Sequence, residues 1–172
     1  GSAGRTVSRS VFVSRPTHPH PLACPVKILL VTDYAQPAGG AELKFLRLRD
    51  GLRQRGHDAR VFSSTAVSGP GPSFADYTCH GTTAPYRTLL QSANPFAARQ
   101  LRRVLSSFQP DVVHVGVFLT QLSPLILPAL RTVPSLYHAA WYRPVCPTAT
   151  KTLPTGAPCT EHWGGACYRH GC

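Results

Sequence analysis

Two neighbouring glycines, Gly39 and Gly40, stand just before a run of helical periodicity, a position suited to binding an anion. A ligand can approach the backbone of a glycine closely because no side chain is in the way. The free N–H groups and the dipole at a helix N-terminus favour phosphate. A Gly-Gly pair is also typical of a tight turn. The pair therefore predicts either a turn or a phosphate-binding loop.

These glycines are not part of a dinucleotide fingerprint. The pattern Gly-x-Gly-x-x-Gly is absent, and the strand predicted over residues 57–63 runs into Ser63 and Ser64 instead of an acidic residue. Both features disfavour an NAD-dependent enzyme.

Four cysteines gather at the end of the sequence, and they could bind a metal. We term them the cysteine cluster: Cys146, Cys159, Cys167 and Cys172. Clustered thiols that stay reduced suggest a metal site, and thiolates favour zinc in a closed tetrahedral shell. The spacing contains no Cys-x-x-Cys, so free thiols or a disulfide remain alternatives. His162 and His170 are spare candidate ligands.

The elements that must position these groups alternate between strand and helix. Short apolar runs predict four strands, over residues 26–32, 57–63, 111–118 and 133–138. Between them, helical spacing or capping signals predict helices over residues 41–52, 95–108 and 123–130. This order predicts an α/β fold with a Rossmann-like parallel sheet flanked by helices.

In such a sheet, ligands bind beyond the carboxyl ends of the strands. Residues 33–40, 118–121 and 138–142 should therefore share one rim. His138 falls on that rim, where it is either a functional side chain or a structural histidine that ends a strand. The long stretch 66–93 is functional, partly disordered or contains short elements of its own.

The chain is strongly basic, with 18 Lys+Arg against 7 Asp+Glu and a net charge of +11. One explanation of the charge is the codon usage of a GC-rich genome. The other is a surface attracted to an anionic membrane or a phosphorylated ligand. The expected basic surface comprises Arg47, Arg53, Arg99, Arg102 and Arg103. No nucleic-acid-binding motif is present, and no apolar run is long enough to span a membrane, so we expect a cytoplasmic protein, peripheral at most.

Several blocks of the sequence resemble, in order, the opening of family-4-type retaining glycosyltransferases. They are Lys-Ile-Leu-Leu-Val-Thr-Asp-Tyr, Gly-Gly-Ala-Glu, Arg-Gly-His, Gln-Pro-Asp-Val-Val-His, Val-Pro leading to His138, and Cys146-Pro147. The resemblance covers about residues 27–172. It implies the N-terminal half of a GT-B fold, in which two Rossmann-like domains face each other across a cleft.

The resemblance also implies a mechanism and a set of partners. The N-terminal domain binds a glycan, lipid or small-molecule acceptor, and a C-terminal domain binds a nucleotide-sugar donor. Gly39 and Gly40 would donate amides to the donor diphosphate, and His138 would lie beside the transferred sugar as the catalytic side chain. Transfer would retain the anomeric configuration and need no cofactor, which leaves structural zinc as the one metal expected.

The resemblance also predicts the organisation of the chain and shows two departures from the family. We expect a disordered extension over residues 1–25, an acceptor-side domain over 26–140 and a truncated cysteine-rich segment over 141–172. Ala139 stands where the family usually has Asp, and Gly116 where it often has a second His. No glutamate pair of a donor domain follows, so the chain would be inactive alone. The alternative is a non-catalytic half-domain or pseudoenzyme.

Overall fold

The first apolar run forms the central strand of a parallel sheet, as its composition predicts. Residues 24–37 and 39–172 are described by the computed structural model. Strand β1, Lys27–Val31, pairs in parallel with β2, Asp58–Ser64, on one side and with β4, Val112–Val115, on the other. Leu29 and Val31 enter one hydrophobic core, whereas Ile28 and Leu30 enter a second. Both faces of this strand are therefore buried.

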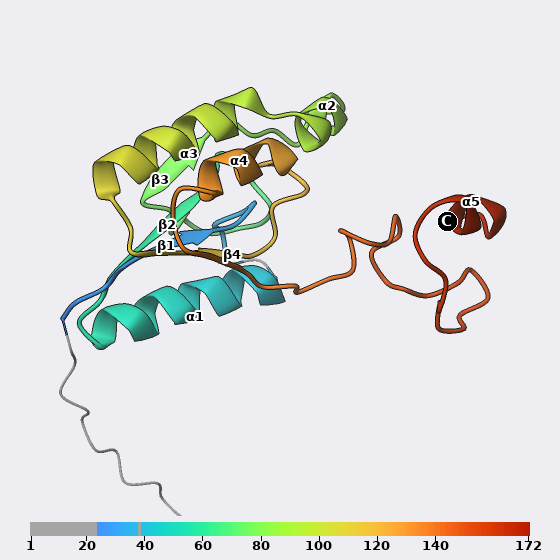
Figure 1. Ribbon diagram of the computed structural model, residues 1–172, viewed down its shortest axis with the longest axis horizontal. Helices are drawn as coiled ribbons and strands as arrows, with labels where there is room; N and C mark the ends of the chain where they lie inside the picture. The colour runs from blue at the N-terminus through green and yellow to red at the C-terminus, as the bar shows by residue number, and fades with distance from the viewer. Residues whose placement is uncertain (1–23, 38) are drawn as a thin grey trace, which may run out of the picture.

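Helices cover both faces of the sheet (Figure 1). Helix α1, Gly40–Gln54, packs on one face through Phe45. Helices α3, Pro95–Phe108, and α4, Leu127–Leu130, lie on the other, with the 3-10 turn η1, Pro124–Ile126, leading into α4. The predicted Rossmann-like α/β class is confirmed.

Helix α3 begins where its capping residues predict. The Oδ1 atom of Asn94 accepts a hydrogen bond from the backbone N–H of Ala97 at 3.0 Å, and Pro95 is the first helical residue. The Nδ2 atom of Asn94 donates to the carbonyl oxygens of His80 and Gln121 at 3.1 and 2.7 Å. This fully buried side chain therefore joins the helix start to two loops.

The stretch 66–93 contains short elements, which was one of the three alternatives. Strand β3, Tyr77–Cys79, pairs in parallel with β2, and helix α2 spans Arg87–Ser92. The described sheet thus has five strands in the order β3-β2-β1-β4-β5, one more than the four predicted. The last, β5, is Ser135–Tyr137, and all three of its residues are exposed at the sheet edge.

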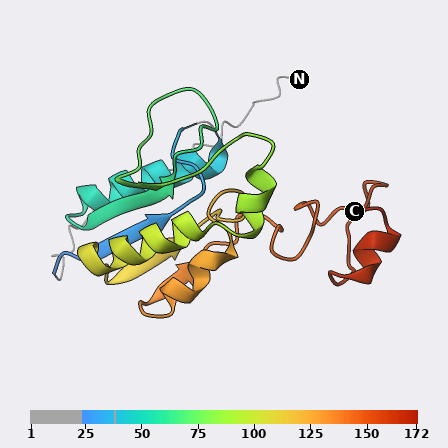
Figure 2. The ribbon, with the colours of Figure 1, turned by 90° about the horizontal axis from the view of Figure 1, so that it is seen from above.

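The cysteine-rich segment leaves the sheet beyond its carboxyl edge. Both views show residues 141–172 projecting away from the α/β layers, with helix α5, Gly165–Arg169, at the far end (Figures 1 and 2). Otherwise its regular structure is one antiparallel bridge between Thr152 and Pro158. The predicted extension over residues 1–25 lies almost entirely outside the described residues.

Candidate functional site at the carboxyl rim

The parallel strands bring the predicted rim segments to one edge of the sheet. The backbone N–H of Gly116 donates to the carbonyl of Val31 at 2.8 Å, and that of His138 donates to Val115 at 2.7 Å. The ends of β1, β4 and β5 are therefore joined in register. His138 reaches the rim because it directly follows β5.

The loop after β4 is held by Asp33, whose role the sequence did not reveal. Its carboxylate accepts hydrogen bonds from the backbone N–H groups of Thr120, Gln121 and Leu122 at 2.7 to 2.9 Å. Burial raises the pKa of Asp33, while these bonds and the Thr120 hydroxyl lower it. Because Asp33 is inaccessible to solvent, it positions the rim loop instead of contacting a ligand.

Gly39 and Gly40 lie at the N-terminus of α1, and the space in front of Gly40 is open. Gly39 is the N-cap with extended backbone, and no side chain caps this helix end. An added Cβ would meet no atom within 4 Å at Gly40, whereas at Gly39 it would lie 2.6 Å from Oε2 of Glu42. The start of α1 is therefore open to an anion at Gly40, whereas the Glu42 carboxylate borders Gly39.

The same helix contacts His138 one turn further on. The Nζ atom of Lys44 lies 2.6 Å from Nε2 of His138. Gly40 and Lys44 are four residues apart on α1, so they share one face of the helix. The structure therefore brings the glycine pair and His138 to the same corner of the rim, as the sequence predicts.

A second histidine lies behind His138. The ring centroids of His114 and His138 are 5.8 Å apart, and those of His114 and Phe45 are 5.3 Å apart. Burial lowers the pKa of His114, and electrostatic repulsion by the protonated forms of His138 and Lys44 lowers it further. The buried Nε2 atom of His114 has no hydrogen-bond partner among residues 24–37 and 39–172. We interpret His114 as a neutral packing residue beneath the rim.

Gly116, the second departure from the family pattern, has a physical reason in this structure. A Cβ atom placed on Gly116 would overlap the ring of Phe45. Phe45 is buried, with 3% of its surface exposed, and its ring occupies the place of a side chain at position 116. A histidine could not stand there without displacing the Phe45 ring.

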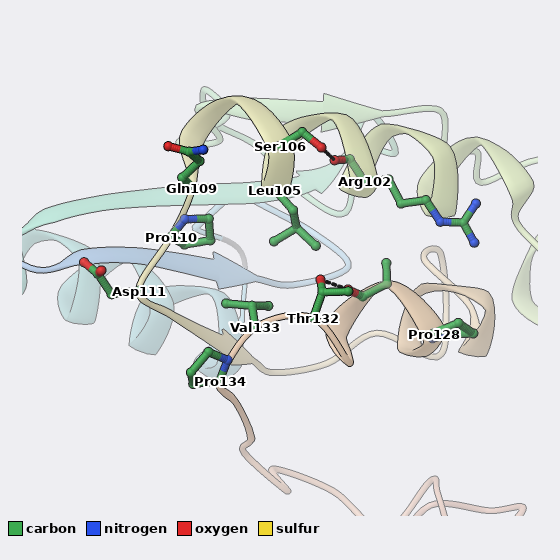
Figure 3. Close-up of a pocket in the computed structure, with 11 residues that line it drawn as sticks. Arg102, Leu105, Ser106, Gln109, Pro110, Asp111, Pro128, Thr132, Val133 and Pro134 are labelled. Carbon is green, nitrogen blue, oxygen red and sulfur yellow. Dashed lines mark hydrogen bonds between the residues drawn. The ribbon is translucent and has the colours of Figure 1, made fainter.

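A further hollow in the described surface lies at the opposite edge of the sheet. It measures about 700 Å³, and Figure 3 shows side chains of α3 facing those of the α4–β5 connection across it. The hydroxyls of Ser106 and Thr132 in its lining donate hydrogen bonds to backbone carbonyls of their own turns. The carboxylate of Asp111 accepts a hydrogen bond from the backbone N–H of Lys27. None of Gly39, Gly40 and His138 lines this hollow, so it is separate from the predicted site.

The predicted basic surface is not continuous. Arg47 and Arg53 lie on α1, and the other three arginines lie on α3, across the sheet (Figure 1). Arg53 also pairs with both carboxylate oxygens of Asp76 at 2.9 Å. The five arginines therefore form two separate groups, and the one on α3 carries three of the charges.

The cysteine cluster lines one small cavity of about 10 Å³. All four thiols are free, and no group of three or more His, Cys, Asp or Glu side chains in the described chain is arranged to hold a metal ion as it stands. A hydrogen bond from Thr148 lowers the pKa of Cys146 to about 7, helped by the backbone N–H groups of Lys151, Thr148 and Thr150.

None of the helices in the part of the chain that the structure describes is both long and apolar enough to cross a membrane.

Comparison with known proteins identifies the family. The family model for Glycosyltransferase Family 4 matches residues 38–154, which include Gly39, Gly40, His138 and Cys146. No curated protein matches. One solved structure, glycinamide-RNase-transformylase T from Mycobacterium tuberculosis, is 16% identical over 64% of this chain and 26% of its own, with a TM-score of 0.31. That likeness is too distant to bear on the fold, whereas the family model covers more than half of the sequence. The chain belongs to glycosyltransferase family 4 and carries a glycosyltransferase-type domain.

Proposed function

We propose that this chain is the acceptor-side half of a retaining glycosyltransferase, which moves a sugar from a nucleotide-sugar donor to a glycan, lipid or small-molecule acceptor. The observation that carries the proposal is the corner formed by α1 and His138. There the open N-terminus of α1 lies one helical turn from the Lys44–His138 contact. A diphosphate and the sugar attached to it need two such groups close together.

The roles follow from the chemistry of the groups. The N–H groups at Gly39 and Gly40 would bind the diphosphate and stabilise the charge that develops on it as the glycosidic bond breaks. Lys44 adds a positive charge on the same side. His138 would hold the sugar near its anomeric carbon. We propose that this transfer needs no cofactor.

The donor would be held mainly by a second domain, present in cis or in trans. The chain described here folds into one Rossmann-like sheet, and its rim offers only one wall of a cleft. We therefore expect the isolated chain to bind nucleotide sugars weakly and not to turn them over. Sugar transfer by the purified chain alone would contradict this expectation.

One observation favours a second candidate, a non-catalytic binding module. The residue after His138 is Ala139, where the family usually has Asp, and its exposed side chain cannot hydrogen-bond a sugar hydroxyl. Transfer by the complete protein would exclude this candidate. Binding of an acceptor without any transfer would support it.

The decisive experiment is Gly40→Val in the complete enzyme. A Cβ atom at this position would lie within 4 Å of no other protein atom, so the variant should fold normally. The valine side chain would nevertheless block the approach of a phosphate to the backbone. We expect activity to fall about 100-fold, the loss typical of removing one oxyanion donor. Gly51→Val, on the same helix but away from the rim, is the matched control. Equal kinetics for both variants would show that the loop is only a turn.

We further propose a cytoplasmic location with peripheral membrane contact through α3. This helix carries three arginines, Arg99, Arg102 and Arg103. A lipid is one of the three proposed classes of acceptor. An anionic leaflet would attract such a group. We expect no nucleic-acid partner, because the sequence contains no nucleic-acid-binding motif.

A further inference from the structure

The segment that follows β5 is held together without a hydrophobic core. Within residues 141–172 the large apolar side chains are mostly exposed: Tyr142 by 54%, Val145 by 44%, Trp163 by 74% and Tyr168 by 91%. Ordering a chain costs about 1–2 kcal/mol per residue, and apolar burial of this extent does not offset that cost. Another interaction must stabilise the path of this segment.

Four thiols converge where that interaction is needed. The cysteine cluster comes from three separate turns of the segment, yet all of its members line a single cavity. Backbone hydrogen bonds fix these turns: the N–H of Cys159 donates to Lys151 at 2.7 Å, and that of Cys172 donates to Cys167 at 2.9 Å. The cavity, about 10 Å³, has room for one atom and not for an organic ligand.

The turn after Cys146 is shaped around its sulfur. Ala149 and Lys151 both adopt the left-handed region, with φ of 63° and 55°, which is unfavourable for residues with a side chain. The hydroxyl of Thr148 lies 3.2 Å from the Cys146 sulfur, and the backbone N–H of Ala149 donates to the carbonyl of Cys146 at 3.0 Å, so the turn closes on this thiol.

We propose that the cysteine cluster binds one zinc ion in a closed tetrahedral site, and that this ion fixes the segment leaving the catalytic rim at His138. Four thiolates and no open position are the donor set of a structural zinc site. As described, the side chains are not arranged to hold an ion. Binding therefore includes rotation of the thiols about χ1, each into another staggered rotamer, to close the cavity around the metal.

Two other groups border the cavity and are not assigned as ligands. His170 and Glu161 also line it, but both are exposed side chains on the outside of the turns. The ammonium of Lys151 donates to the backbone carbonyl of Glu161 at 2.6 Å and stands beside the cluster. Its charge would offset part of the negative charge of a tetrathiolate zinc site.

The test is metal analysis of the chain purified under reducing conditions. We expect close to one zinc ion per chain, lost in each single Cys→Ser variant of the cluster and retained in the control Cys24→Ser, an exposed thiol outside it. His170→Ala should also retain the ion, and loss of zinc in that variant would overturn the all-cysteine assignment. Cobalt substituted for zinc should give the intense visible absorption of a tetrahedral thiolate site.

A second measurement keeps the test valid if a variant fails to fold. Limited proteolysis with a chelator should open residues 141–172 while residues 24–140 stay protected. Zinc-free protein whose four thiols all react with an alkylating agent would overturn the proposal, and so would a disulfide within the cluster. Neither measurement requires sugar transfer, so the zinc site is tested independently of the proposed glycosyltransferase reaction.

Discussion

The ammonium of Lys44 lies 2.6 Å from Nε2 of His138, although 94 residues separate them in the chain. An ammonium group can only donate, so Nε2 of the neutral imidazole must accept, and its proton stands on Nδ1. Helix α1 thereby sets the tautomer of the residue that follows β5. Whatever His138 donates to, it does so through Nδ1.

Replacing Lys44 should release that tautomer. In Lys44→Met the Nε2 atom loses its donor, so we expect a shift towards the usual Nε2–H form, measured from the imidazole ¹⁵N chemical shifts of the neutral side chain. Lys27→Met, at the opposite edge of the sheet, should leave the shifts unchanged. An unaltered His138 spectrum in Lys44→Met would mean that the contact does not persist in solution.

The stability of the domain should depend on pH through His114. Burial lowers the pKa of His114 below 6.5, with contributions from His138 and Lys44, so the unfolded chain takes up this proton first as pH falls. His114 therefore leaves the free energy of unfolding unchanged above pH 6.5. It lowers this free energy progressively as the pH falls from 6.5 through the pKa of His114 in the folded state.

Urea unfolding at about pH 7.5 and about pH 5.5 would measure this effect. We expect His114→Gln to lose less stability between the two values than the parent chain does. His162→Gln, an exposed control, should behave like the parent. Identical pH dependence in all three proteins would contradict the role given to His114.

Asn94 is expected to be among the most sensitive polar positions. Asn94→Ala removes the α3 cap and leaves the carbonyls of His80 and Gln121 without their donor, which should lower the free energy of unfolding by about 2–4 kcal/mol. Asn94→Asp keeps the cap acceptor and loses only the donors. If the two variants unfolded at the same urea concentration, the cap would contribute nothing.

Gly116 and Phe45 should be energetically coupled. Gly116→Ala forces the Phe45 ring to move, which should cost about 1–3 kcal/mol. In Phe45→Leu the smaller side chain leaves room for that methyl group, so the double variant should lose less stability than the sum of the two single variants. Strict additivity would show that the ring and position 116 do not share space.

The arginines of α3 should govern membrane binding if the acceptor is lipid-linked. Binding to anionic vesicles should fall with added salt and fall further when Arg99, Arg102 and Arg103 are changed to Gln. A charge-matched control changes three exposed arginines elsewhere, Arg47, Arg143 and Arg169. An equal loss of vesicle binding in both triple variants would show that binding depends only on the net charge of the protein.

The sequence predicts the elements whose signals are local. The apolar run of β1 and the Asn94–Pro95 start of α3 depend on neighbouring residues, and both are found where predicted. Strand β3 has three residues, too few to show an alternating pattern, so it was missed. It is a strand because β2 offers it a free edge.

The sequence predicts that Gly39, Gly40 and His138 share one rim, and the structure places them there, while their roles in binding and catalysis stay predictions. The parts that hold the site depend on contacts that no local pattern records. Asp33 binds a loop 87 to 89 residues away, and Lys44 reaches His138 from a different element. Arg53 was expected on a free basic surface, but its pairing with Asp76 becomes visible only when the chain is folded.

The strand order also bears on how the protein is made. Of the five described strands, β1 is synthesised first and lies in the middle of the finished sheet, and its second neighbour, β4, begins only at Val112. During translation one edge of β1 and the apolar side chains beneath it stay uncovered until that distant strand emerges. Nascent chains of this protein should therefore be clients of a ribosome-associated chaperone, and pausing translation before Val112 should increase aggregation more than pausing after Tyr137.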